Sequence, residues 1–252
     1  MSAGGCRTLV FGRYPAPGRV KTRLAAGTGA DAACAFYSAC LAHTVSQVSA
    51  WVAEARDEGR HSSSGALCYS DACDKAALER WLTRHSLGGV ELVAQAQDTQ
   101  DLGVRLRNAL ADGLSQPGIS CAMVVGSDSP DLSPAILREA ARTLSLHDVV
   151  FGPCFDGGYY LVGCRGSAAL DALFSGVPWS SPTVLAVSLS LAQGAGLQVA
   201  PLDTLPTLMD IDQMEDLVAF LARARPDHPL QAAACAALAA STLREVASGV
   251  SP

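Results

Sequence analysis

Four basic side chains lie close together in a glycine- and proline-containing segment near the start of the chain, GRYPAPGRVKTRLA. They are Arg13, Arg19, Lys21 and Arg23. Arginine binds phosphate with a two-pronged fork and lysine adds a compact positive charge, so this segment, which begins at Gly12, is predicted to bind phosphate groups. It is not a Walker loop, because G-x-x-x-x-G-K-[ST] is absent from it, and the plainer alternative is a solvated basic turn.

Carboxylates follow a buried run in the stretch VVGSDSPDL, residues 124–132. The run CAMVVG reads as a strand that ends at Gly126, so Asp128 is expected at the carboxyl edge of a sheet. Mg²⁺ prefers oxygen ligands and is usually held by one or two carboxylates together with substrate phosphates. Asp128 is therefore a candidate metal ligand, whereas Asp131 is either a second ligand or a cap for the following turn.

A second acidic pair lies in the stretch MDIDQMEDL, residues 209–217. Asp210 and Asp212 alternate across one residue, so in an extended segment both side chains face the same side. Both are candidate metal ligands. Asp212 is alternatively the N-cap of the following helix, with Glu215 as its capping-box partner. We expect one metal ligand and one helix cap from this pair.

The stretch GPCFDGGYYLVG, residues 152–163, places an acid and two glycines between two short apolar runs. The Asp-Gly pair is a strong signal for a simple hairpin turn. The functional alternative is that Gly157 and Gly158 allow a ligand to approach the backbone closely, with Asp156 and Tyr159 at its edge. The sequence leaves these two interpretations open.

Apolar runs of strand length alternate with segments of helical periodicity along the chain. This alternation is typical of an α/β protein whose largely parallel sheet is covered by helices on both faces. Strands are expected over 7–12, 66–71, 89–96, 121–126, 148–153 and 159–164. Helices are expected over 31–48, 74–85, 101–114, 133–145, 182–196, 212–224 and 229–248, and a loop over 55–65. No internal repeat or clear linker interrupts this order, so a single domain over 1–252 is predicted.

The composition excludes several classes of protein. The net charge of −6 argues against a nucleic-acid partner, although a local basic patch still permits small anionic ligands. No apolar run approaches the roughly 20 residues that a membrane span needs, and the N-terminus lacks a signal core. The 9 cysteines show no C-x-x-C spacing and are interpreted as small buried residues in a reducing compartment. A soluble cytoplasmic protein is the expectation.

These segments together describe a nucleotide-dependent transferase. A basic loop would hold phosphates, and carboxylates from two distant segments would hold Mg²⁺ or Mn²⁺. The cation and the basic side chains would neutralise the charge that develops on a phosphoryl leaving group. Lys21 and Asp128 are thus candidate catalytic residues, and Asp156 is a candidate by its position. No G-x-S-x-G motif suggests a serine nucleophile instead.

Six ordered motifs resemble a known family. They are FGRYPAPGRVKTRLA, DLGVRLRNAL, GSDSPDL, GPCFDGGYYLVG, PWSSPTVL and MDIDQMEDL. They resemble bacterial proteins of the nucleotide-diphospho-sugar transferase superfamily, once grouped as a domain of unknown function and labelled glycosyltransferases in arsenosugar biosynthesis. The resemblance implies a GT-A-like, Rossmann-related fold, a divalent metal at Asp128 and substrate contacts from Asp101, Arg105 and Trp179. The motif-bearing core spans about 7–225, and the alanine-rich helix over 229–248 lies outside it.

The motifs also resemble a second kind of enzyme. KTRL and SDSP are similar to segments of the guanylyltransferase that activates phospholactate and of its molybdenum-cofactor relative, which move a nucleotide rather than a sugar. The first hypothesis is therefore transfer of a sugar from a nucleotide-diphospho-sugar to a small-molecule acceptor. The second is nucleotidyl transfer from a nucleoside triphosphate with release of pyrophosphate. A non-catalytic nucleotide-binding protein is the third.

Overall fold

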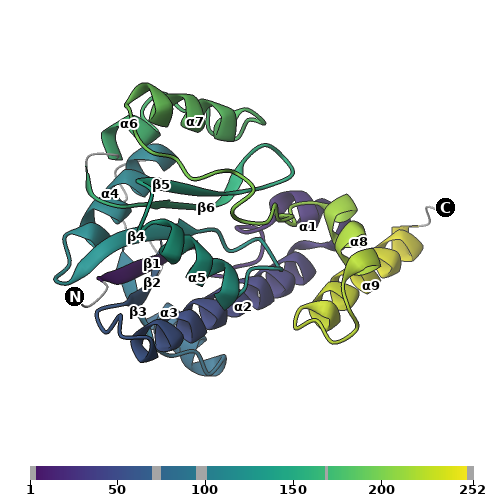
Figure 1. Ribbon diagram of the computed structural model, residues 1–252. Coiled ribbons are helices and arrows are strands. Elements are labelled where there is room, and N and C mark those ends of the chain that lie inside the picture. Colours follow the sequence, from purple (N-terminus) through teal and green to yellow (C-terminus); the bar gives the residue numbers. More distant parts are fainter. Residues whose placement is uncertain (1–3, 70–74, 95–100, 168–169, 249–252) are drawn as a thin grey trace.

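The computed structural model of the chain describes residues 4–69, 75–94, 101–167 and 170–248. Within this part of the chain, strands form one six-stranded sheet in the order β3-β2-β1-β4-β6-β5 (Figure 1). They are β1 (Gly5–Gly12), β2 (Ser64–Tyr69), β3 (Val90–Ala94), β4 (Ile119–Val125), β5 (Val149–Pro153) and β6 (Tyr159–Cys164). Strands β3, β2, β1 and β4 pair in parallel, whereas β6 runs antiparallel to both of its neighbours. The predicted α/β class with a mostly parallel sheet is confirmed.

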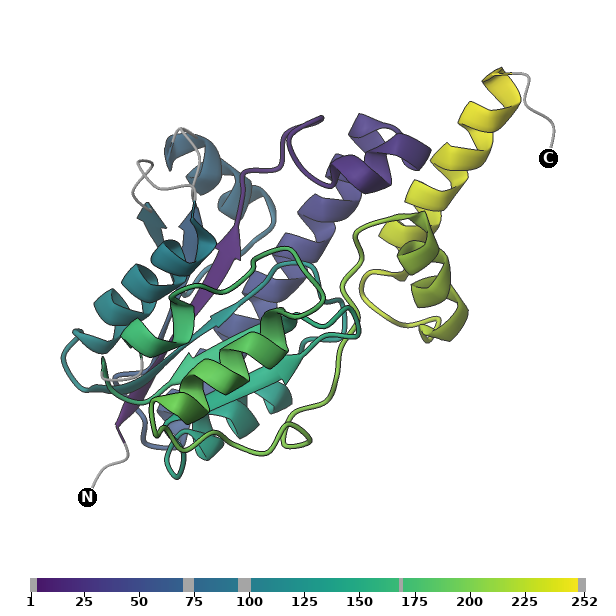
Figure 2. The same cartoon turned by 90° about the horizontal axis from the view of Figure 1, so that it is seen from above.

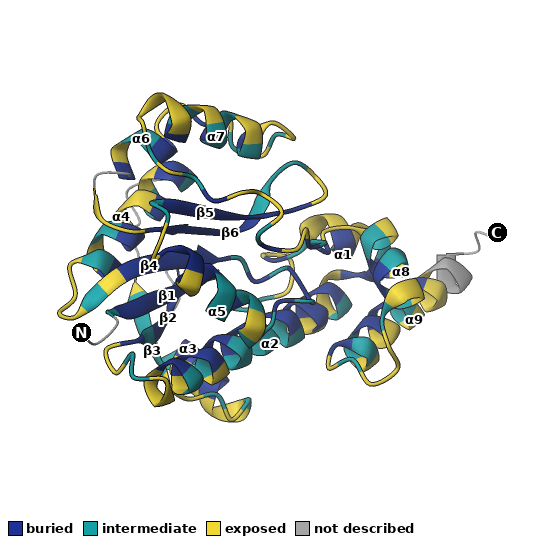
Figure 3. Cartoon of the chain, viewed as in Figure 1, coloured by how far each residue is buried: buried dark blue, intermediate teal, exposed yellow. Residues whose placement is uncertain are grey.

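Helices cover both faces of the sheet, because successive strand side chains point to opposite sides (Figure 1). One face carries α2 (Ala30–Asp57), α3 (Lys75–Arg84) and α5 (Pro134–Thr143), and the other carries α4 (Leu102–Leu114), α6 (Leu170–Phe174) and α7 (Val184–Gly194). On β1, Val10 belongs to the buried cluster that includes α2, and its neighbour Leu9 belongs to the cluster that includes α4. Figure 3 shows the strands buried between these layers.

A third buried cluster lies at one end of the molecule. It joins α1 (Thr22–Thr28) and the first part of α2 to α8 (Met214–Arg223) and α9 (Gln231–Ser248). Leu24 of α1 and Phe220 of α8 are fully buried in it. Figure 2 shows α8 and α9 extending away from the sheet on the side of α1. The alanine-rich C-terminal helix thus packs against the helix that follows the predicted phosphate loop.

The helices differ from expectation in three places, one of which is the short helix α6, where no helix is expected. Helix α2 continues to Asp57 instead of ending near residue 48, because Trp51, Val52 and Ala55 extend its buried stripe. The loop expected over 55–65 is shorter for the same reason. Helix α1 was not expected, because the prolines and glycines before it read as an open loop. The ends of the second and third expected strands, at 70–71 and 95–96, lie outside the described residues.

The segments that carry the predicted site residues meet at one edge of the sheet. The carboxyl ends of β1 and β4 lie together because these strands are parallel. Strand β6 runs the opposite way, with Leu161 opposite Val125, so the turn that precedes it lies at this same edge. The acidic segment near residue 210 joins them through backbone hydrogen bonds from Leu208 N to Pro153 O (3.0 Å) and from Ile211 N to Asp128 O (3.1 Å).

Over the residues that it describes, the structure shows the burial of the cysteines and the length and apolarity of the helices. Cys235 is exposed, and the other described cysteines are buried with free thiols. Cys73 lies outside the described residues. No helix among the described residues is both long and apolar enough to span a bilayer.

Candidate functional site

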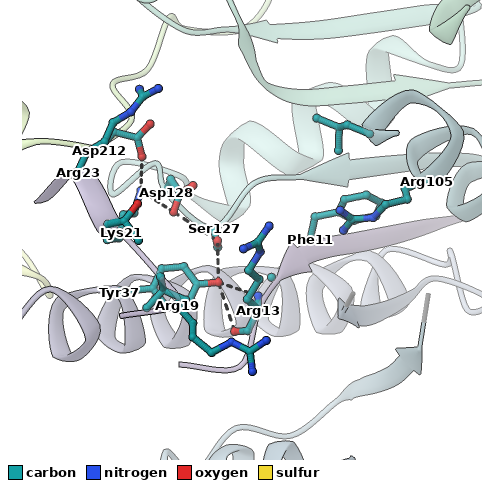
Figure 4. Close-up of a pocket in the computed structure, with 14 residues that line it drawn as sticks. Phe11, Arg13, Arg19, Lys21, Arg23, Tyr37, Arg105, Ser127, Asp128 and Asp212 are labelled. Carbon is teal, nitrogen blue, oxygen red and sulfur yellow. Dashed lines mark hydrogen bonds and ion pairs between the residues drawn. The ribbon is translucent and has the colours of Figure 1, made fainter. Parts of the chain in front are cut away.

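The loop after β1 forms one wall of a cavity of about 390 Å³. All of the residues predicted to bind phosphate line this first cavity, namely Gly12, Arg13, Arg19, Lys21 and Arg23. Arg105 joins them from α4, with its guanidinium carbon 5.5 Å from the centre of the Phe11 ring (Figure 4). Arg105 is far from this loop in the sequence. The fold brings the two together because α4 packs against β1 and β4.

Lys21 lies at the centre of the acidic residues. Its Nζ is 2.8 Å from Asp128 Oδ1 and 2.6 Å from Asp212 Oδ1, and its side chain is only 4% exposed (Figure 4). Burial alone would lower the pKa of Lys21, but the two carboxylates outweigh burial and raise that pKa above its ordinary value. The lysine therefore stays charged and draws the two acidic segments together.

The backbone of Lys21 adopts an unusual conformation. Its φ of 47° and ψ of 47° lie in the left-handed region, which costs a residue with a Cβ about 1 kcal/mol or more. Lys21 is also the N-cap of α1, and it makes no side-chain capping hydrogen bond there. Its side chain is directed instead to Asp128 and Asp212. The backbone is thus strained at Lys21, whose charged side chain lies between the two acidic segments.

Tyr37 and Ser127 complete this wall, and neither is among the residues predicted for the site, although Ser127 lies within the motif GSDSPDL. The hydroxyl of Tyr37 accepts a hydrogen bond from Arg13 N at 2.8 Å and lies 3.5 Å from Ser127 Oγ (Figure 4). Ser127 Oγ is in turn 3.4 Å from Asp128 Oδ1. Burial, followed by the charge of Asp128, raises the pKa of Tyr37 to about 12, so the phenol stays protonated. Tyr37 lies in the helix expected over 31–48, where the apolar periodicity indicates only a packing residue.

Asp210 is half-buried, whereas Asp212 is exposed. One of the carboxylate oxygens of Asp210 accepts a hydrogen bond from Ser129 Oγ, and the other accepts one from Cys154 Sγ at 3.2 Å. Burial raises the pKa of Asp210 to about 6, and the nearby charge of Asp128 adds to this, although the Ser129 hydrogen bond opposes it. A positive charge placed beside Asp210 would relieve this destabilisation.

The capping predictions are partly corrected. Asp212 is not the N-cap of α8; that position is Gln213, and the side chain of Asp216 accepts hydrogen bonds from the backbone N–H groups of Asp212 and Gln213, each at 3.0 Å. The capping box is therefore shifted by one residue, which frees the carboxylate of Asp212 for Lys21. Asp131 lines neither the first cavity nor the second cavity described below. It forms an ion pair with Arg223 of α8 at 2.7 Å instead.

A second cavity, of about 630 Å³, adjoins the first. It is lined by the predicted residues Asp156, Gly158, Tyr159, Trp179 and Asp210. Arg23, Asp128 and Asp212 line both cavities, so the two meet at the acidic cluster. The stretch around Asp156 is a hairpin turn, as the simpler interpretation held, and its residues Asp156, Gly158 and Tyr159 also line this cavity.

Gly157 supports the second cavity without lining it. Its φ is +87°, and a Cβ at this position would lie 2.0 Å from the carbonyl oxygen of Pro182. Its own carbonyl accepts a hydrogen bond from Leu185 N at 3.0 Å. The hairpin turn is thus seated directly against the segment that carries Trp179. Asp101 likewise lies outside both linings and is the N-cap of α4, where its carboxylate accepts from Val104 N at 2.9 Å.

The residues present fit a divalent cation. Asp128 and Asp212 already share one positive charge through Lys21, and Mg²⁺ is commonly held by one or two carboxylates with substrate phosphates supplying further oxygens. The basic residues that would bring those phosphates line the same cavity. Within the described part of the chain, no group of three or more His, Cys, Asp or Glu side chains is placed so that it could hold a metal ion. A cation at Asp128 and Asp212 would therefore need oxygen ligands from the substrate as well.

A family model matches the middle of the chain. It is described as an uncharacterised protein conserved in bacteria (DUF2064), and the match covers residues 55–181. No curated protein sequence matches the chain significantly.

Several solved structures share the fold. A protein of Desulfovibrio desulfuricans G20, described as a "putative nucleotide-diphospho-sugar transferase", superposes with a TM-score of 0.76 and 25% identity over 96% of this chain and 98% of its own. A nucleotidyl transferase from Methanothermobacter thermautotroptrophicus gives a TM-score of 0.52 at 16% identity, with coverages of 91% and 100%. A cytidylyltransferase from Leptospira borgpetersenii gives 0.51 at 10%, with coverages of 97% and 96%. The last two show likeness of fold only, and the predicted GT-A-like architecture is confirmed.

Proposed function

Since the chain belongs to the bacterial family DUF2064, whose description states no activity, we propose its function from the site: it is a transferase that uses a nucleotide-activated donor. The more specific proposal is transfer of a sugar from a nucleotide-diphospho-sugar to a hydroxyl group of a small-molecule acceptor. The description of the Desulfovibrio protein, which is similar over nearly the whole length of both chains, supports this choice.

One observation carries the proposal. Lys21 Nζ bridges Asp128 and Asp212 at the place where a strongly basic cavity meets an acidic and aromatic one. A donor whose diphosphate occupies the first cavity would direct its sugar towards the second. The bond to be broken would then lie beside the acidic cluster.

The site residues have separate tasks in this reaction. Arg13, Arg19, Arg23 and Arg105 bind and orient the diphosphate, because guanidinium groups form paired hydrogen bonds to phosphate oxygens. Lys21 neutralises negative charge on the leaving phosphate. Bound Mg²⁺ or Mn²⁺, held by Asp128 and Asp212 with Asp210 as a further candidate ligand, would supply Lewis-acid stabilisation of the same charge.

The transfer itself exchanges one carbon–oxygen bond for another. An acceptor hydroxyl forms a bond to the anomeric carbon, the bond from that carbon to the diphosphate oxygen breaks, and the nucleoside diphosphate leaves with the electron pair. The hydroxyl proton passes to a carboxylate of the second cavity. Asp156 is our candidate base, because it lies at the turn on the side of the acceptor.

Nucleotidyl transfer is the second candidate, and one observation favours it. Five basic side chains line the first cavity, which suits the greater charge of a triphosphate. In that reaction, an acceptor oxygen would attack the α-phosphorus and pyrophosphate would leave. The same residues would bind the phosphates, but the departing product would differ.

The departing product is therefore the test. The protein is incubated with Mg²⁺ or Mn²⁺ and either nucleotide-sugars or nucleoside triphosphates, and phosphorus NMR follows the products. Nucleoside diphosphate released from a nucleotide-sugar, and lost in Asp128→Asn but not in the matched control Asp131→Asn, supports sugar transfer. Pyrophosphate from a triphosphate would establish the second candidate. Absence of both products and of any thermal shift with either donor class would overturn the proposal.

A further inference from the structure

The two cavities differ sharply in charge. Five basic and two acidic side chains line the first cavity. One basic and four acidic side chains line the second, among the residues that the structure describes. The basic residue is Arg23, which lies at the boundary and also lines the first cavity. The second cavity thus has no basic side chain of its own among the described residues.

Pairing does not remove this acidic character. Asp128 and Asp212 share the charge of Lys21, but Asp156 and Asp210 remain. Asp156 Oδ1 accepts a hydrogen bond from Gly158 N at 2.9 Å within the hairpin turn, which orients the carboxylate without neutralising it. Hydrogen bonds from the Ser129 hydroxyl and the Cys154 thiol hold Asp210 in the same way. Carboxylates held like this repel an anion and accept hydrogen bonds from hydroxyl groups.

Aromatic rings form another part of the same cavity. Tyr159 and Trp179 lie edge to face with ring centroids 6.5 Å apart. Each ring is braced from behind: Phe151 lies 5.2 Å from Tyr159, and Phe174 is stacked 6.5 Å from Trp179. Rings fixed in this way offer apolar surface at little cost in side-chain entropy, and a second ring or the C–H face of a saturated ring can pack on them.

We infer that the second cavity takes an uncharged, hydroxyl-bearing ring compound and rejects acceptors that carry phosphate or carboxylate groups. This inference rests on the proposed function, because it names the acceptor class of that transferase. The carboxylates of Asp156 and Asp210 would accept hydrogen bonds from the hydroxyl groups of this compound. The rings of Tyr159 and Trp179 would pack against the C–H face of its ring.

Among the described side chains of this lining only Arg23 is basic. The donor phosphates would bind Arg23. They would also complete the coordination of a cation at Asp128 and Asp212, which leaves neither Arg23 nor the cation for an anionic acceptor.

The test measures binding in the second cavity while the first is filled. UDP, GDP, CDP and ADP are first screened with Mg²⁺ by thermal shift, and the best one is then kept saturating so that phosphate-bearing probes cannot use the basic cavity. Methyl β-glucoside, glucose 6-phosphate and glucuronate are compared by saturation-transfer NMR. We expect the glucoside to bind at least about tenfold more tightly than either anion. The cavity carboxylates would repel the one or two negative charges of each anion, and solvent would screen this repulsion only in part.

Two variants and one control locate the effect. Trp179→Ala should abolish the glucoside signal, whereas Phe155→Ala, which removes an exposed ring that does not line the cavity, should leave it unchanged. Asp156→Asn keeps the turn hydrogen bond and should reduce the discrimination against glucose 6-phosphate. If Trp179→Ala fails to fold, Trp179→Phe with a melting curve replaces it and should retain weakened glucoside binding.

The outcomes separate the inference from the proposed function. Equal or tighter binding of the anions, with nucleotide bound, would overturn the inference and leave the transferase proposal standing. A failure of every nucleoside diphosphate to bind would count against the transferase proposal. On the nucleotide-free protein the basic cavity is open to the anions, so only the part of each probe's signal that Trp179→Ala removes would report the charge preference of the second cavity. Glucoside binding that persists in Trp179→Ala would also overturn the inference.

Discussion

Lys21 Nζ lies 2.6 Å from Asp212 Oδ1, although 191 residues separate the two in the chain. This contact joins the loop after β1 to the segment before α8 and places a buried positive charge at the boundary of the two cavities. The lysine thereby holds the acidic residues in position and offers charge neutralisation to a ligand. Four predictions test the site around it.

Replacing Lys21 by methionine should weaken nucleotide binding at least about tenfold, because it removes a buried ammonium directed at the phosphate cavity. Isothermal titration with a nucleoside diphosphate and Mg²⁺ measures the effect. Lys75→Met is the matched control, since Lys75 is 62% exposed and pairs only weakly, 3.8 Å from Glu79. Equal affinity in Lys21→Met and the parent protein would remove this lysine from the binding site.

Asp128→Asn should abolish the dependence of nucleotide affinity on divalent cation while the fold persists. The carboxylate is 37% exposed and contributes little packing, so the melting temperature should change by only a few degrees. Affinity is compared with and without Mg²⁺. Asp131→Asn is the control, because Asp131 lies three residues away and pairs with Arg223 instead. A cation effect that survives in Asp128→Asn would place the metal elsewhere.

Asp210 should make the protein more stable at mildly acidic than at neutral pH. Its folded-state pKa of about 6 exceeds the ordinary value of 3.8, so the folded state binds more protons. The resulting stability is fully present below about pH 4 and is lost as pH rises through 6; its full size is on the order of 3 kcal/mol.

The neutral isostere Asp210→Asn isolates this effect. Denaturant unfolding of both proteins from pH 4 to pH 8 should show a smaller loss of stability across this range in the variant, and a higher free energy of unfolding than the parent at pH 8. Added Mg²⁺ should reduce the difference if Asp210 lies beside the cation. Identical pH profiles would show that Asp210 is not the perturbed carboxyl.

Gly157→Ala should destabilise the turn and impair the second cavity. The new methyl group would collide with the carbonyl oxygen of Pro182, and the φ of +87° is strained for alanine. Gly176→Ala isolates the conformational term, because Gly176 has a φ of +75° and no atom within 4 Å of the added Cβ. We expect the Gly157 variant to lose about 2 kcal/mol more in unfolding free energy than the control. Equal losses would mean that the loop with Pro182 shifts freely.

The sequence by itself determined the strand and helix pattern and the chemical character of the four segments. Continuous apolar runs of strand length such as CAMVVG favour strands buried between two layers, and a cluster of guanidinium groups has few uses in an acidic protein. The helices expected over 101–114 and 133–145 also begin within one residue of the observed starts of α4 and α5. These features depend on neighbours in the chain, so they can be predicted from sequence.

Only the tertiary structure decided which charges meet. Asp131 and Asp212 both read as a ligand or a cap, yet Asp212 pairs with Lys21 and Asp131 with Arg223. Tyr37 carried only the helical periodicity of a packing residue, but the loop folds back so that Arg13 N donates to its hydroxyl. Such contacts depend on where the chain reverses and on the direction of each strand. Neither can be read from the spacing of the contacting residues in the sequence.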